Sequence, residues 1–281
     1  MFRRIACLAP HGGRCPAPEA CPYHQVFEPA PPPDAAALST LDDIPRPFVI
    51  APAPAAGRAY RAGDEVAFDL NLIGRAREFF PHFVVTLREL RALGRGRHPV
   101  ALRRIEAVDS FGGRPTPVYR DEDNLVRSHD ASVSLGTCAH LAPPQGPVTL
   151  RFLTYTRLKH DGDWARRPEF HVVFRRLLGR LSSLALFHCG VRLDLDFVDL
   201  IERAKAVRLV EDRTRWEDWT RYSSRQDRRM TLGGLVGEAV YEGPLDGLWP
   251  FLVFGQWTHV GKNATFGLGR YEIVDAPQEG A

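Results

Sequence analysis

Hydrophobic positions in the second half of the chain follow the spacings of strands and helices in turn. Residues 148–158 alternate apolar and polar side chains, as a strand does, and residues 170–187 place apolar side chains on one helical face. Two further strands are predicted at 206–220 and 230–241, a helix at 245–260 and a last strand at 267–274. The predicted order is strand, helix, strand, strand, helix, strand.

The first half repeats part of this order. Residues 47–53 and 65–74 are predicted strands, residues 76–93 a helix with one apolar face, and residues 101–108 another strand after a glycine-rich turn. We therefore predict an α+β protein with tandem ferredoxin-like (RRM-like) domains, at 1–125 and 126–281. Residues 2–8 leave room for the end of a helix only, so we expect the first domain to lack its opening strand, through a misassigned start or an incomplete domain.

Composition predicts a cellular location and shows an uneven distribution of charge along the chain. No apolar run is long enough to span a membrane and the first residues lack the core of a signal peptide, so we expect a cytoplasmic protein without a membrane partner. Net charge is only +3, but residues 151–180 carry eight Lys or Arg against three acidic residues, and residues 203–229 carry nine against five. Such asymmetry suits a phosphate-facing surface, although solvated faces of helices and strands would show the same excess of basic residues.

The run LWPFLVFGQWTHVGKNATFGLGRYEIV, residues 248–274, is the most informative segment. It predicts an apolar helix, a glycine-rich loop and a strand, with a lysine, a histidine and an arginine beside the glycines. Glycines allow a backbone to approach a ligand closely, so we expect the loop to offer backbone N–H groups to phosphate. The residues concerned are Gly261, Gly267, Gly269 and Arg270, joined by Arg225, Arg228 and Arg229 from the aromatic and basic hairpin WEDWTRYSSRQDRR.

This segment resembles the glycine-rich signature of the CRISPR repeat-processing endoribonucleases, within the RAMP group of RNA-binding proteins. The resemblance is strongest over residues 222–274, moderate for PYHQVFEP and EVAFDLNLIG, and slight elsewhere. It implies processing of CRISPR repeat RNA into guide RNAs for antiviral defence. It further implies attack by the 2′-hydroxyl, which leaves a 2′,3′-cyclic phosphate and a 5′-hydroxyl.

The residue types agree with cleavage that needs no metal. The carboxylates of DEDN, residues 121–124, lack a strand context for a two-metal site, so we expect neither a metal nor an organic cofactor. Metal-free cleavage needs a base, an acid and a cation at the phosphate. We predict Lys262 as the cation and His259 as base or acid, while a histidine capping a helix end would read the same way. His24, His98 and His188 are the next candidates.

Two alternatives stay open. The chain could be a non-catalytic RNA-binding RAMP subunit, with other CRISPR effector subunits as partners. It could instead be an interaction domain stabilised by zinc, because Cys7, Cys15 and Cys21 cluster with His11 and His24. The spacing lacks a Cys-x2-Cys pair, so unliganded loop cysteines are the preferred interpretation.

Overall fold

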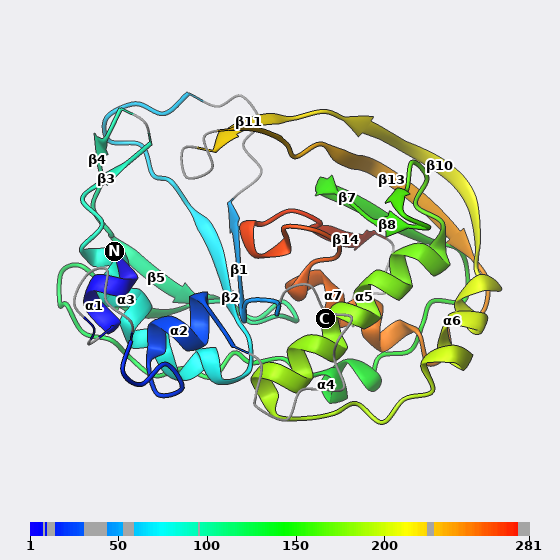
Figure 1. Ribbon diagram of the computed structural model, residues 1–281, viewed down its shortest axis with the longest axis horizontal. Coiled ribbons are helices and arrows are strands. Elements are labelled where there is room, and N and C mark those ends of the chain that lie inside the picture. Colours follow the sequence, from blue (N-terminus) through cyan, green and yellow to red (C-terminus); the bar gives the residue numbers. More distant parts are fainter. Residues whose placement is uncertain are drawn as a thin grey trace. The chain divides into compact units, whose positions relative to one another are not determined.

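The computed structural model (Figure 1) divides into two compact units. It describes residues 1–7, 9, 15–30, 44–52, 59–94, 96–223 and 228–274, with the backbone alone at 220–223 and 228–231. One unit joins residues 1–47 to 72–133, and the other joins residues 48–71 to 134–281. This division differs from the predicted boundary at 125/126, because the segment 48–71 packs with the C-terminal part of the chain.

The C-terminal unit is built on a four-stranded antiparallel sheet in the order β10-β13-β7-β14. Its strands are β7 (Val148–Thr156), β10 (Arg208–Glu217), β13 (Gly234–Glu242) and β14 (Tyr271–Val274). Helix α5 (Phe170–Leu184) follows the first of these strands, and α7 (Trp249–Thr258) precedes the last. The order along the chain and across the sheet is ferredoxin-like, which agrees with the prediction for this half.

Alternation along β7 separates the two faces of this sheet. Leu150 and Phe152 are fully buried, and Phe152 lies against Tyr271 of β14 with ring centroids 6.3 Å apart. The Tyr271 hydroxyl donates to the carbonyl of Leu252 in α7 at 2.6 Å. Phe174 of α5 meets Phe251 of α7 edge to face at 5.9 Å. Helices α5 and α7 therefore cover one face, and burying these rings stabilises the unit.

Smaller elements complete the C-terminal unit. Helix α6 (Phe197–Lys205), which the sequence reading missed, starts at Asp196, whose carboxylate accepts from the Asp199 N–H. The hairpin β11–β12 (Thr220–Ser223, Arg228–Thr231) extends beyond β10. The remaining elements are α4 (Leu135–Ala139), β8 (Lys159–His160), β9 (Asp163–Trp164), a π turn (Ala185–Cys189) and η4 (Ala264–Phe266).

The N-terminal unit forms no four-stranded sheet among its described residues. Its strands pair only as β3 (Ala92–Leu93) with β4 (His98–Pro99) and β5 (Arg104–Ala107) with β6 (Thr116–Arg120). Its helices are α1 (Phe2–Ala6), α2 (Pro22–Phe27), η2 (Gly74–Phe79) and α3 (Phe80–Arg88). The predicted strands at 47–53 and 65–74 form β1 (Phe48–Pro52) and β2 (Phe68–Leu72), which pair with each other and, apart from Leu72, belong to the C-terminal unit. Within the residues that the structure describes, the ferredoxin-like order is thus seen in the second half only.

Candidate nucleic-acid interface

The glycine-rich loop joins α7 to β14 and is tightly packed against its own unit. Gly261, Gly267 and Gly269 all have positive φ angles, of 84°, 83° and 69°. A Cβ on Gly269 would lie 1.7 Å from the Val260 carbonyl oxygen, and one on Gly267 would lie 2.6 Å from that of Ile50 in β1. These glycines therefore allow backbone to pack on backbone, where the sequence predicted a close approach to a ligand.

Neighbouring strands hold the loop in place. The Gly269 N–H donates to the Tyr155 carbonyl at 3.2 Å, and the Val260 N–H donates to the Gly269 carbonyl at 3.0 Å. The Arg270 guanidinium, predicted to contact RNA, pairs with the Asp69 carboxylate of β2 at 3.3 Å. Because Asp69 neutralises it and it is largely covered, Arg270 offers little charge to a ligand in this conformation.

His259 ends α7 with a φ of 60° and is only 1% exposed. Its Nδ1 lies 3.2 Å from the Leu268 carbonyl oxygen, so the ring fastens the two ends of the loop together. The pKa of His259 is lowered to about 4, mainly by burial and in smaller part by the nearby positive charges of Arg270 and Arg180. Arg180 also caps α7, because its Nε donates to the Thr258 carbonyl at 2.8 Å. This burial does not fit the predicted contact of His259 with RNA.

Two side chains of the loop face solvent. Lys262 is exposed, and its own N–H donates to the Arg157 carbonyl at 3.1 Å, which fixes the base of its side chain. Phe266 is 61% exposed at the end of η4, a large apolar side chain with little cover. The sequence analysis did not single out Phe266. An aromatic residue in the glycine-rich loop, between Lys262 and Gly267, is nevertheless a signal for base stacking.

Aromatic and basic side chains continue beside the loop on neighbouring strands. Trp219 is 42% exposed and stacks on Tyr155 of β7, with ring centroids 6.0 Å apart. The guanidinium of Arg157 lies 4.1 Å above the Trp164 ring, and that of Arg166 lies 4.0 Å above Trp216. Flat rings paired with guanidinium groups are a suitable surface for single-stranded RNA. We call Tyr155, Arg157, Trp219, Lys262 and Phe266 the loop-side patch.

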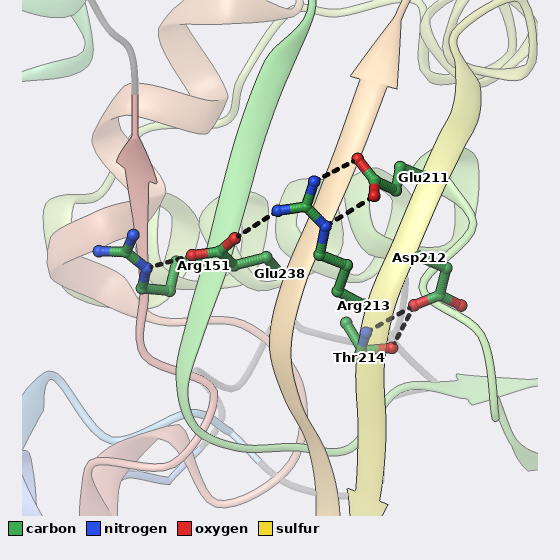
Figure 2. A network of polar contacts seen from close by, with 6 residues as sticks. All are labelled: Arg151, Glu211, Asp212, Arg213, Thr214 and Glu238. Atoms are coloured by element: carbon green, nitrogen blue, oxygen red, sulfur yellow. Dashed lines mark hydrogen bonds and ion pairs between the residues drawn. The ribbon is translucent and has the colours of Figure 1, made fainter.

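The other end of the uncovered sheet face carries a charge network (Figure 2). Arg151 of β7 bonds Glu238 of β13 at 2.7 Å. It also bonds Glu272 of β14 at 2.7 Å. Arg213 of β10 binds both carboxylate oxygens of Glu211 at 2.7 Å and reaches Glu238 at 3.6 Å. Three carboxylates thus face two guanidinium groups, so this region is not cationic and is a poor match for phosphate.

The remaining predicted residues lie on other elements or outside the described residues. Arg225 lies outside the described residues, and Arg228 and Arg229 are described only as backbone of β12. His188 is buried in the π turn after α5, and exposed His98 lies in β4. The carboxylates of Asp121 and Asp123, for which no metal site was expected, pair with Arg103 and Arg127.

The C-terminal unit contains a segment that matches a known protein family. Residues 150–271 match the family model of the CRISPR-associated endoribonuclease Cas6. This segment belongs to the Cas6 family. The match runs from β7 through α7 and the glycine-rich loop into β14, so the resemblance read from the sequence is confirmed. Residues 1–131 match a second model, AF_1859_N, described as an N-terminal domain, and no curated protein matches the sequence.

Solved Cas6 structures share the fold. A Cas6 product complex has a TM-score of 0.57 and 18% identity, covering 83% of this chain and 83% of the other. Thermus thermophilus Cas6 has a TM-score of 0.51 and 16% identity, over 81% of this chain and 79% of its own. The product complex of another Cas6 has a TM-score of 0.50 and 18% identity, over 86% and 87%. At such identities these likenesses concern the fold alone. No described helix has the length and apolar character of a membrane span.

Proposed function

We propose that this Cas6-family chain is an endoribonuclease that cuts CRISPR repeat RNA to release guide RNAs. The observation that carries the proposal is the match of residues 150–271 to the Cas6 endoribonuclease over a ferredoxin-like sheet that ends in the glycine-rich loop. The loop-side patch supports it, because the patch combines exposed rings with positive charge next to that loop. The repeat RNA is the proposed partner, and the cytoplasm is the proposed location.

We further propose that cleavage needs no metal ion. The 2′-oxygen attacks the adjacent phosphorus and the bond to the 5′-oxygen breaks, which gives a 2′,3′-cyclic phosphate and a 5′-hydroxyl. Such a reaction gains most from a cation that stabilises the charge on the phosphorane oxygens. Lys262 is suited to this role, because it is exposed and its backbone is fixed by the bond to Arg157. Carboxylates in the described ranges form no group of three that could hold a catalytic metal pair.

His259 takes a positioning role in this proposal. Its ring joins the end of α7 to Leu268 and so keeps Lys262 and Phe266 at the surface of the loop. The catalytic role predicted for His259 would require the loop to open and expose the ring. His259→Asn retains a side-chain amide that can bond the Leu268 carbonyl, so a positioning role predicts near-normal cleavage at neutral pH, while a proton-transfer role predicts its loss.

The proposal is tested with the purified chain and repeat RNA from the same genome, in EDTA. We expect one cut per repeat, a cyclic-phosphate end, and a rate at least about tenfold lower for Lys262→Ala. Lys205→Ala is the matched control, because Lys205 is another surface lysine, on α6 and paired with Glu202. Tight binding without cleavage by the wild-type chain would instead support the RNA-binding subunit.

A further inference from the structure

The N-terminal unit gathers four side chains that are typical metal ligands. Cys7 ends α1, Cys21 begins α2, His24 lies one turn into α2, and Cys15 comes from the connection between the helices. The three sulfur atoms and a histidine nitrogen all lie within 4.8 Å of one another. Ligands of a tetrahedral zinc, with Zn–S bonds of about 2.3 Å, are separated by roughly 3.8 Å. A shift of about 1 Å therefore completes such a site.

The histidine is oriented for binding through one ring nitrogen. His24 Nδ1 lies 3.4 Å from a carboxylate oxygen of Glu28, and the other oxygen of Glu28 accepts from the Tyr23 hydroxyl at 2.8 Å. The opposite nitrogen, Nε2, is buried and has no hydrogen-bond partner within the described residues. A carboxylate that holds one nitrogen of a histidine while the other binds metal is a recurrent arrangement. The buried Nε2 thus indicates a missing ligand.

We propose that Cys7, Cys15, Cys21 and His24 bind one structural zinc ion through three thiolates and an imidazole nitrogen. Three sulfur ligands favour zinc over the harder magnesium and calcium ions, which prefer oxygen. Four protein ligands fill a tetrahedral shell and leave no position for water or substrate, so the ion has no part in RNA cleavage. This proposal departs from the expectation of no metal made from the sequence, where a zinc-stabilised domain was only an alternative.

The N-terminal unit has a physical need for such a site. Helices α1 and α2 have five and six residues, and helices of that length are unstable alone. Phe2 and Phe27, with ring centroids 4.9 Å apart, and Phe83 provide a small aromatic cluster between them and α3. A metal bound at the end of α1 and the start of α2 would fix the two helices together, as metals do in other small units.

Metal content tests the proposal directly. We expect about one zinc per chain after expression with zinc, measured by inductively coupled plasma mass spectrometry. Cys15→Ser and His24→Ala should lose most of it, whereas His24→Cys should keep it, because a fourth thiolate also fits tetrahedral zinc. Cys189→Ser is the control, since Cys189 is an exposed free cysteine of the C-terminal unit. Cobalt in place of zinc should show the intense visible bands of a tetrahedral thiolate complex.

Chelation separates a structural ion from a functional one. All five tryptophans lie in residues 134–281, so their fluorescence reports the C-terminal unit alone. A strong chelator should therefore reduce far-ultraviolet circular dichroism and protease resistance of the N-terminal unit while tryptophan fluorescence stays unchanged. Zinc below about 0.2 per chain, equal zinc in the Cys15→Ser variant, or a mass two hydrogens low from a Cys–Cys bond would overturn the proposal.

Discussion

Replacing Gly269 with alanine should unfold the C-terminal unit at markedly lower denaturant. The residue has a φ of 69°, a conformation that costs an L-amino acid about 1–2 kcal/mol. Its new Cβ would also lie 1.7 Å from the Val260 oxygen, so one of the two segments must move. Moving either one breaks or stretches the Val260–Gly269 and Gly269–Tyr155 hydrogen bonds, each worth about 0.5–1.5 kcal/mol. Together these terms predict a loss of roughly 2–5 kcal/mol.

The assay is urea unfolding followed by tryptophan fluorescence. Gly179→Ala is the control, because Gly179 lies within α5 with open space around its Cβ position. There alanine should stabilise the unit, by roughly 0.5–1 kcal/mol, through its higher helix propensity. A Gly269→Ala variant that lost less than about 1 kcal/mol would refute the tight loop packing on which the exposure of Lys262 and Phe266 depends.

Three further perturbations test the loop and the sheet face. The stability of the wild type should fall by up to roughly 3 kcal/mol between pH 6.5 and pH 4. The reason is that folded His259, with its pKa of about 4, stays largely neutral over this range while His259 of the unfolded chain takes up a proton. His259→Asn should flatten this pH dependence in urea titrations. Phe266→Ala should weaken RNA binding by roughly 1–3 kcal/mol in fluorescence anisotropy, whereas Phe266→Trp should retain it. Arg151→Ala should leave RNA affinity unchanged and alter stability little, because Arg151 is exposed to solvent and its ion pairs with glutamates are screened. A large loss of affinity would instead indicate that RNA binds that face.

Periodicity in the sequence predicted the four sheet strands and the helices α5 and α7 of the C-terminal unit. Strand β7 and helix α5 carry clear alternating or helical spacing, because one face of each is buried, and both were predicted within a few residues. Helix α6 was missed, although its buried side chains Leu200, Ile201 and Ala204 have helical spacing. Strand pairing in the first half was not predictable, since which strands pair depends on contacts distant in sequence. There the expected ferredoxin-like sheet, predicted without its opening strand, is replaced in the described residues by separate pairs of strands.

Candidate site residues were harder to predict because exposure is a property of the fold. The sequence placed His259 beside Lys262, but the turn at the end of α7 buries the first and exposes the second. The sequence analysis looked for a Cys-x2-Cys pair and therefore gave little weight to Cys21 and His24, which are three residues apart. The start of α2 brings these two side chains onto one helical face. A cysteine and a histidine at this spacing are a usable signal for a metal site when further cysteines lie nearby.

Cleavage of the chain's own repeat RNA in EDTA, with analysis of the product ends, tests the central claim most directly. The account predicts a single cut that leaves a 2′,3′-cyclic phosphate, slowed at least about tenfold by Lys262→Ala and unaffected by Lys205→Ala. Cleavage that requires added divalent metal and leaves a 3′-hydroxyl would contradict the proposed chemistry. A rate untouched by Lys262→Ala would contradict the assignment of the site to the glycine-rich loop.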